Sequence, residues 1–503
     1  MRKYYWLLCL LGFLNVTDAL ADSIRVRPCR PVNYQLSAHN AKSRRALSTF
    51  NYQLSTSNPY IGDRRQLVVL VSFSDQTFEQ DDPLPMWNRI FNEEHYTEAP
   101  YYGSVHDYFY DQSYGQLRLT FDLCWIKLEE SCAKYRSNDY DDENSQYLVD
   151  DIVTALTERD TDWSLYDWDG DSYVDQLLIV YAGLGMNDGG GSNTIWPHQW
   201  WMTEHQDSDG NKREALTVYH DGKPYKIDSY CCVQERTKKL DSSTFGTLCH
   251  EYSHCFGLPD FYDYSKSYVY SWDLMDYGNY TGNGFRPVGY SAHERMLMGW
   301  LTPVELTEPA IITDMPSTST HPVCYIIRND ANTNEYYMVE NRQQTSWDTD
   351  LPGSGIVVFH VVFDSHEWKF GSVNNASIQR YTIFPANNKT NTKYESGWAY
   401  PYEQNDSLTN YSAPASTLYY ANTDSTKLMS KPLRAMNVKD GLASFRFMDA
   451  DPSSHVEELS TLNPQPSTLY DLTGRPVTPR VERGTRPLPR GIYISEGKKI
   501  LVK

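Results

Sequence analysis

The sequence predicts an α+β fold in which helices and strands are mixed up to about Trp300 and strands dominate beyond it. Two continuous apolar runs, residues 66–73 and 174–182, have the length and the β-branched content of buried strands. Amphipathic segments with apolar residues at helical spacing accompany these runs. Beyond Trp300 the pattern changes to short alternating runs between turn residues, which indicates a β-rich, sandwich-like domain.

The elements of the first part can be placed in chain order. Residues 84–114 look largely helical, residues 117–123 alternate as a strand does, and residues 144–158 form an amphipathic helix. A further helix spans residues 244–256, with a core stripe at 3–4 spacing made of Phe245, Leu248, Tyr252 and Cys255. A last helix at residues 290–298 ends this part of the chain.

In the second part, strands are predicted at residues 323–327, 336–339 and 355–362. Residues 387–425 are rich in Asn, Thr, Ser and Tyr and are expected to form long loops.

Composition limits the kinds of partner. The chain has 503 residues with 40% hydrophobic and 14% aromatic residues, enough for more than one folded domain. The formal net charge of −20 argues against a nucleic acid partner, because such a partner requires a basic surface. We interpret the acidic balance as an ordinary solvated surface.

The N-terminus predicts a signal peptide over residues 1–21. Arg2 and Lys3 precede a mostly apolar run, and residues 19–21 supply a small-x-small cleavage site. The run is too short to span a bilayer, and no later segment of ~20 apolar residues follows. We therefore expect an exported chain without a transmembrane segment. The polar residues 22–62 are predicted to be a pro-segment, with an ordinary extended arm as the alternative.

The most informative segment is His-Glu-Tyr-Ser-His at residues 250–254. On a helix, residues four apart share one face, so His250 and His254 can both bind one Zn²⁺. Glu251 then lies beside the metal, where a carboxylate can act as the base of a hydrolase. Such a motif can also arise by chance on an amphipathic helix in a chain with 13 His.

The residues after this motif favour the metal hypothesis. Gly257 can end the helix in a left-handed cap, which lets the chain turn back and present Asp260 as a third ligand. The spacing resembles the metzincin signature with Asp in place of the third His, and Met275 is a candidate for the Met-turn. A rival set takes its third ligand from Glu294 on the helix at 290–298, as in gluzincins.

An acidic segment suggests a second metal. Asp167, Asp169, Asp171 and Asp175 alternate in a turn, and closely spaced carboxylates suit Ca²⁺. The segment departs from the EF-hand pattern because its Gly is at the fourth position. A solvated acidic turn without calcium is the alternative.

Eight of the nine Cys lie beyond the predicted signal peptide, which contains Cys9. An exported chain permits disulfides, and Cys124 with Cys132 could close a hairpin. Cys231 or Cys232 could pair with a Cys of the helix at 244–256. Cys29, in the predicted pro-segment, could bind the zinc as a blocking thiolate; a disulfide or an idle thiol are the alternatives.

Residues 66–385 resemble the immune inhibitor A-type metalloproteases. The resemblance is carried by the segments at 71–75, 113–116, 167–183, 195–198, 250–263, 272–275, 299–301, 340–342, 351–353 and 359–361. It implies a zincin-like catalytic domain over residues 63–302, a β-rich domain over 303–450 and secreted endopeptidase activity. By the family's pattern His250, His254 and Asp260 bind zinc and Glu251 is the general base. Tyr277 is carried over as a transition-state hydrogen-bond donor, with a packing role as the alternative.

Residues 453–503 resemble the small β sorting domain of type IX secretion substrates, through the segments at 469–475, 488–493 and 497–503. This resemblance implies a Gram-negative producer, a secreted or cell-surface location, and the outer-membrane secretion machinery as a partner.

The predicted function is hydrolysis of peptide bonds in protein or peptide substrates, with Zn²⁺ as cofactor and calcium as a second metal. The alternative is an inactive or narrow-specificity surface adhesin, or a glycoprotein-binding protein, on the same scaffold. The intact base and ligands speak against an inactive protein.

Overall fold

The computed structural model describes residues 58–136, 144–207, 210–263, 266–375 and 377–448, with the backbone of a few short strands farther on. The predicted signal peptide, residues 22–57 of the predicted pro-segment and Cys29 lie outside the described residues. Within the described part, no helix is long and apolar enough to cross a membrane.

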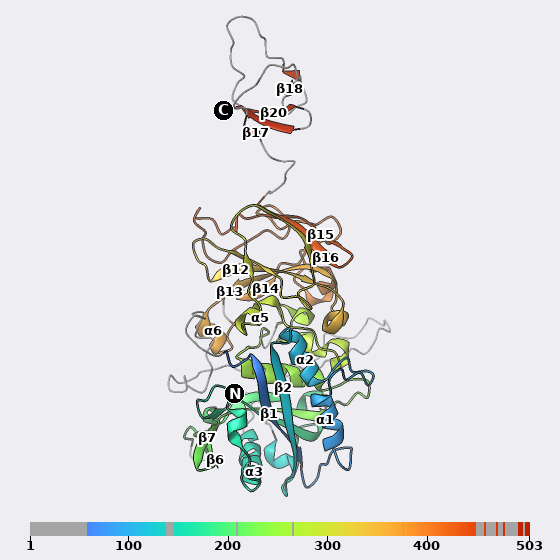
Figure 1. The fold of residues 1–503 in the computed structure, drawn as a ribbon, viewed down its shortest axis with the longest axis vertical. Coiled ribbons are helices and arrows are strands. Elements are labelled where there is room, and N and C mark those ends of the chain that lie inside the picture. The colour runs from blue at the N-terminus through green and yellow to red at the C-terminus, as the bar shows by residue number, and fades with distance from the viewer. Residues whose placement is uncertain are drawn as a thin grey trace, which may run out of the picture.

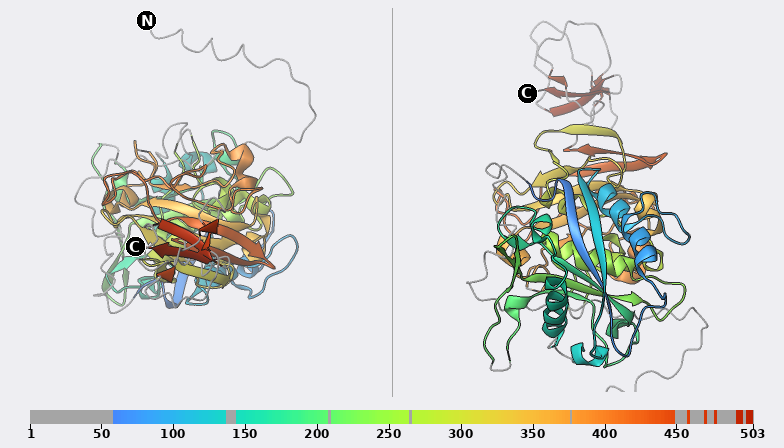
Figure 2. Two further views of the ribbon diagram at one scale, coloured as in Figure 1. Left: turned by 90° about the horizontal axis from the view of Figure 1, so that it is seen from above. Right: turned by 60° about the horizontal axis from the view of Figure 1, so that its bottom comes forward.

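The first half of the chain is built on a sheet with the strand order β2-β1-β4-β8-β5. Its strands are β1 (Gly62–Ser72), β2 (Leu117–Lys127), β4 (Leu177–Leu184), β5 (His198–Trp201) and β8 (Ser229–Arg236). The strands from β2 to β8 are parallel, and β5 is antiparallel at the edge. Figure 2 (right) shows the blue β1 beside β2.

Helices cover both faces of this sheet, which explains why its central strands are continuous apolar runs. Val68 and Leu70 of β1 pack in one core with α1 (Leu84–Asn92), α2 (Val105–Gln112) and α4 (Phe245–Ser253). Val69 and Val71 point to the other face and pack with α3 (Ser145–Thr157). A small sheet of β3 (Tyr173–Val174), β7 (Lys223–Ile227) and β6 (Leu216–His220) lies on that side as well.

The second half is β-rich, as predicted. One sheet has the order β14-β13-β12-β11-β9, and a second has the order β10-β16-β15. The strands are β9 (Val304–Glu305), β10 (Ala310–Met315), β11 (Tyr325–Arg328), β12 (Glu335–Arg342), β13 (Gly355–Val362), β14 (Tyr381–Ile383), β15 (Leu433–Lys439) and β16 (Leu442–Phe447). The two sheets share a core that includes Val358 and Phe445, so they pack face to face. Two short helices, α5 (Ala292–Leu297) and α6 (Ser365–Lys369), accompany them.

The β12–β13 sheet has no solvent face, because each of its sides belongs to a different core. Tyr337 and Val358 pack toward the second sheet, whereas Met338 and Phe359 pack with the helices of the first half. Figure 1 shows this arrangement, with β12 and β13 above α5 and with β1 and β2 below it. The downstream sheet therefore lies directly on the elements that surround α4.

Short 3-10 helices occupy many connections: Cys132–Tyr135, Trp163–Tyr166, Met186–Asp188, Met202–Glu204, η5 (His254–Phe256), η6 (Tyr270–Trp272), η7 (Tyr277–Gly284), Ser346–Asp350 and η9 (Thr392–Gly397). Residues 387–425 contain no strand, in agreement with the predicted long loops. Farther on, β17 (Glu457–Glu458), β18 (Leu469–Tyr470), β19 (Pro476–Val477), β20 (Gly491–Ser495) and β21 (Lys498–Val502) form one sheet.

Two expectations need correction. Residues 84–114, expected to be largely helical, hold two helices with a non-helical segment between them, and a capping box of Ser104 and Asp107 starts the second helix, α2. Disulfides are not formed at the suggested positions: Cys124, Cys132, Cys231, Cys232 and Cys249 are free thiols. The mixed α+β prediction itself is confirmed.

Candidate metal centre

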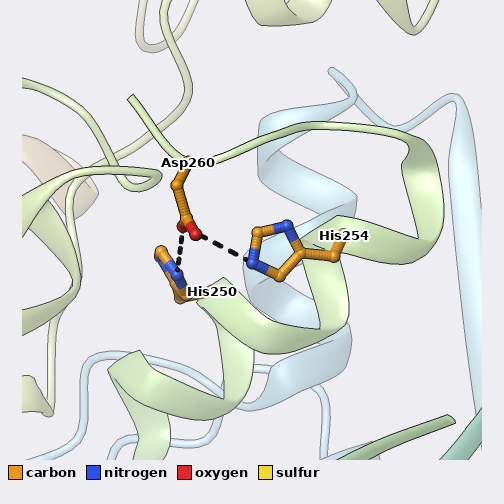
Figure 3. Close-up of side chains that lie close together, drawn as sticks. All are labelled: His250, His254 and Asp260. Carbon is orange, nitrogen blue, oxygen red and sulfur yellow. Dashed lines mark ion pairs between the residues drawn. The ribbon is translucent and has the colours of Figure 1, made fainter. Parts of the chain in front are cut away.

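The candidate centre is built on α4 and on the turn that follows it. The helix ends through η5, and Gly257 adopts the left-handed conformation with φ of 82°. Its amide donates to His254 O at 2.9 Å, which closes the cap predicted from the sequence. The chain then reverses and brings Asp260 back over the two imidazoles (Figure 3).

The three predicted ligands meet at one point. Asp260 Oδ1 lies 3.1 Å from His250 Nε2 and 3.6 Å from His254 Nε2. Ligand atoms held about 2.0–2.2 Å from a tetrahedral zinc would lie about 3.3–3.6 Å from one another. The observed separations therefore leave room for a metal of this size with little rearrangement.

Backbone carbonyls orient both imidazoles. His250 Nδ1 lies 2.8 Å from Leu274 O, and His254 Nδ1 lies 2.7 Å from Leu258 O. A carbonyl oxygen can only accept, so each Nδ1 carries the proton and each Nε2 presents a lone pair to the centre. This is the tautomer that a metal-binding imidazole requires.

Buried polar atoms without hydrogen-bond partners provide the test of fit. His250 Nε2, Asp260 Oδ1 and Glu251 Oε1 are all buried and make no hydrogen bond within the described residues. Leaving such groups unsatisfied is costly, and a bound cation would satisfy the imidazole and the carboxylate together. The donor set of two imidazoles and one carboxylate is also one that zinc accepts.

Charge interactions at the centre are strong. Burial lowers the pKa of His250, but the negatively charged carboxylate of Asp260, 3.1 Å away, outweighs burial and raises the pKa to about 9.

Glu251 lies where a base would be needed. Its side chain is 2% exposed, and Glu251 Oε2 is 3.9 Å from His254 Nε2. It is therefore next to the metal-binding atoms without belonging to the group of three that converges.

Met275, the predicted Met-turn residue, is fully buried near the centre. Its carbonyl accepts from Phe261 N at 2.9 Å, and the preceding carbonyl, Leu274 O, is the one that orients His250. The next element, η7, packs against α4 so closely that a Cβ at Gly246 would come within 1.9 Å of Asn279 O. Glycine at position 246 is what allows this approach.

Tyr277 lies in an aromatic cluster beside the centre. Its ring centroid is 6.5 Å from that of Tyr262, which in turn is 6.4 Å from the ring of His250. The side chain is half-buried, next to Tyr270 at 4.7 Å.

Glu294, the rival third ligand, lies outside the group formed by His250, His254 and Asp260. Its Oε2 accepts from Ser291 N at 2.7 Å and from Ser291 Oγ at 3.0 Å, in the capping box that starts α5. Among the described residues, the group able to hold a metal at α4 contains Asp260 and not Glu294. The geometry thus favours the ligand set with Asp260.

The acidic segment forms a second cluster, in which Asp167, Asp169 and Asp171 converge within 4.8 Å. Asp167 is half-buried and accepts from three backbone amides, those of Gly170, Asp171 and Ser172 at 2.9–3.1 Å. Asp175 turns toward Trp168 N, which donates to its Oδ2 at 2.6 Å.

Sequence reasoning missed the support of the Met275 turn. Asp273 is fully buried and accepts from Met275 N at 2.9 Å and from Tyr381 OH at 2.9 Å. Arg342 donates to Trp272 O at 3.3 Å. These partners come from the downstream strands, and no local pattern distinguishes Tyr381 among 40 Tyr.

One peptidase family model matches part of the chain. Residues 61–299 match the model of the immune inhibitor A peptidase M6 catalytic domain. Immune inhibitor A of Bacillus thuringiensis subsp. alesti is 27% identical over 283 residues, which are 47% of this chain and 40% of that protein. The pre-pro-metalloprotease PrtV of Vibrio cholerae serotype O1 is 22% identical over 255 residues, which are 45% of this chain and 27% of PrtV.

This chain therefore matches less than half the length of these relatives. Two crystal structures of wild type OgpA from Akkermansia muciniphila overlap with 64% and 60% of this chain and with 92% and 90% of theirs. Their identity is 12% and their TM-scores are 0.26 and 0.25, which is too low to carry an argument. The family match and the curated relatives support a peptidase, and a metalloprotease implies a bound metal.

Proposed function

We propose that this protein is a secreted zinc-dependent endopeptidase of the immune inhibitor A type with a zincin-like catalytic domain. The observation that carries the proposal is the convergence of two imidazole Nε2 atoms and one carboxylate oxygen within 4.8 Å. Two of these atoms, on His250 and Asp260, are buried without a hydrogen-bond partner in the described structure. A bound cation would remove the cost of leaving these buried polar atoms without partners.

In this proposal His250, His254 and Asp260 hold the zinc. When bound, zinc polarises the scissile carbonyl and lowers the pKa of the water that attacks it. Leu274 O and Leu258 O keep both imidazoles in the tautomer needed for binding. The carboxylate of Asp260 makes the centre less positive than three imidazoles would.

Glu251 is the proposed general base. It accepts a proton from the attacking water and then delivers that proton to the amine that leaves. Burial beside His254 Nε2, at 3.9 Å, keeps its carboxylate close to the reacting atoms. Tyr277 is proposed to donate a hydrogen bond to the oxygen that gains charge in the transition state.

The route of export belongs to the same proposal. Residues 1–21 would be the signal peptide, residues 22–62 a pro-segment and residues 453–503 a sorting domain read by a Gram-negative outer-membrane secretion system. The acidic segment at Asp167 to Asp175 is proposed as a calcium site that stabilises the first half.

Narrow specificity is a second candidate. A cavity of about 470 Å³ lies between the segment of Tyr268 and the downstream region, lined also by Gln379, Trp398 and Tyr419. Its size suits a small ligand or one substrate group. This cavity is the observation that favours a glycoprotein-binding region.

A digest of mixed proteins tests the function. The purified protein should cleave internal peptide bonds, lose that activity in a chelator and regain it on addition of Zn²⁺, with the cut sites identified by mass spectrometry. Glu251→Gln should keep its zinc and lose about 10²–10⁴-fold in turnover. Cleavage by Glu251→Gln at the wild-type rate would refute the role of this base.

A further inference from the structure

The segment from Asp260 to Tyr277 joins the two sides of the candidate centre. Leu274 O orients His250, and Met275 O accepts from Phe261 N, the amide directly after Asp260. One pair of adjacent carbonyls therefore sets the relative position of two of the three ligands. Whatever holds this pair in place also determines the geometry of the centre.

Tyr381, on β14, holds this pair of carbonyls through Asp273. Its hydroxyl lies 2.9 Å from Asp273 Oδ2 and 2.7 Å from Ser291 Oγ. The other carboxylate oxygen, Asp273 Oδ1, accepts from Met275 N at 2.9 Å. All four residues are fully buried. Removing the hydroxyl would leave one carboxylate oxygen of Asp273 without this partner, in a place that water does not reach.

The same tyrosine holds the Asp260 side as well. Its ring stacks on Phe261 with the centroids 4.0 Å apart and the planes 30° apart. Asn374 completes the contact, because its Nδ2 donates to Phe261 O at 2.7 Å and to Tyr381 O at 2.9 Å. Tyr381 N in turn donates to Asn374 Oδ1 at 3.0 Å.

These contacts come from outside the part of the chain that matches the peptidase family, residues 61–299. Two further contacts reach the same segment from downstream: Glu395 accepts from Ser271 N at 3.3 Å, and Arg342 donates to Trp272 O at 3.3 Å. The downstream region thus supports the segment that carries Asp260 at several points along its length.

We propose that Tyr381 and Asn374 are positioning residues of the metal centre, supplied by the downstream β-rich region. This proposal rests on the proposed zinc site at His250, His254 and Asp260. Tyr381 and Asn374 do not touch the metal; they fix the Phe261 backbone and the Leu274–Met275 carbonyls, through which Asp260 and His250 are aimed. The β-rich region is then part of the catalytic unit rather than an appended module.

Zinc affinity of the full chain tests the proposal. The dissociation constant for Zn²⁺ is measured by competition with a chromophoric chelator, on wild type, Tyr381→Phe and Asn374→Ala. The matched control is Tyr337→Phe, on strand β12 of the same sheet, which removes the hydroxyl of a buried tyrosine that donates to Thr417 O at 2.8 Å. Tyr381→Phe keeps the ring on Phe261, so its fold is expected to persist.

Tyr381→Phe and Asn374→Ala should each bind Zn²⁺ about 10-fold more weakly than wild type, at the lower end of the usual effect of indirect partners of a metal. Tyr337→Phe should bind as wild type does. The visible absorption of the Co²⁺-loaded protein, which reports ligand geometry, should change in Tyr381→Phe and stay unchanged in the control.

Equal zinc affinities for Tyr381→Phe, Asn374→Ala and Tyr337→Phe would overturn the positioning role and leave the proposed function standing. A wild-type protein that binds no Zn²⁺ would overturn both. If Tyr381→Phe does not fold, the comparison of Asn374→Ala with Tyr337→Phe decides by the same criterion.

Discussion

Within the described residues, two clusters of ligand-type side chains converge within 4.8 Å, and they differ in what their atoms already contact. At α4, His250 Nε2 and Asp260 Oδ1 are buried, face each other at 3.1 Å and have no hydrogen-bond partner. In the acidic segment, Asp169 and Asp171 are exposed, and Asp167 accepts from backbone amides of its own turn. The first cluster is suited to a cation, because its buried atoms lack hydrogen-bond partners, whereas the second can exist as a solvated turn.

The comparison teaches that unsatisfied buried atoms indicate a metal better than the number of carboxylates does. The acidic segment has more carboxylates than the cluster at α4 and is easier to notice in the sequence. Its carboxylates nevertheless have backbone and solvent partners available, so the need for a counter-ion is smaller there.

Removing a ligand should have the largest effect. Asp260→Ala is expected to weaken Zn²⁺ binding by more than about 100-fold and to abolish peptide cleavage, because a direct ligand contributes more than its indirect partners do. Metal content after dialysis, measured by elemental analysis, checks this. Glu294→Gln is the control and should retain zinc; loss of zinc from Glu294→Gln alone would instead favour the gluzincin-type ligand set.

Metal-induced stabilisation should separate the two clusters. At 100 times its dissociation constant, Zn²⁺ should stabilise the protein by about 2.7 kcal/mol, seen as a rise in Tm. Calcium should bind the acidic segment more weakly, with a dissociation constant on the order of 10⁻⁴–10⁻³ M. Isothermal titration of wild type and Asp169→Ala checks the calcium prediction, and absence of Ca²⁺ binding to wild type would end it.

Asp167 should matter for stability even without calcium. Asp167→Ala removes the acceptor for three backbone amides, those of Gly170, Asp171 and Ser172, so we expect a loss of about 1–2 kcal/mol in the free energy of unfolding. Urea denaturation in EGTA measures it. Asp169→Ala, an exposed neighbour, should change the stability by less than about 0.5 kcal/mol; equal losses would mean that the turn is not held by Asp167.

A buried carboxyl outside both clusters should make the stability depend on pH. Burial raises the pKa of Glu395 from its ordinary value of 4.5 to about 7. The folded state therefore keeps this proton at pH values where the unfolded state has lost it, and the free energy of unfolding should fall as pH rises from about 4.5 to about 7. Glu395→Gln should make this fall shallower, as measured by thermal unfolding across that range; an unchanged slope would contradict the shift.

The local parts of the fold and of the candidate site could be predicted from the sequence. The buried strands, α3, α4 and the left-handed cap at Gly257 follow from patterns within about fifteen residues. The convergence of His250, His254 and Asp260 follows from helix geometry and one turn. These features depend on residues close in sequence, where spacing determines position.

The non-local parts could not be predicted. The stacking of Tyr381 on Phe261 joins residues 120 positions apart, and nothing in the neighbourhood of Tyr381 indicates its partner. The break between α1 and α2 was missed because the capping box of Ser104 and Asp107 was not recognised. The free thiols of Cys124 and Cys132 show that closeness in sequence does not make a disulfide.

The β12–β13 sheet is a wall shared by two cores, with Met338 and Phe359 on one side and Tyr337 and Val358 on the other. Because both cores contain residues of this sheet, one core cannot unfold while the other stays folded. Heating should therefore produce a single calorimetric endotherm for both halves of the chain. Proteolytic cleavage near residue 302 should leave two fragments that stay associated, because separating them would expose one apolar face of the β12–β13 sheet to water.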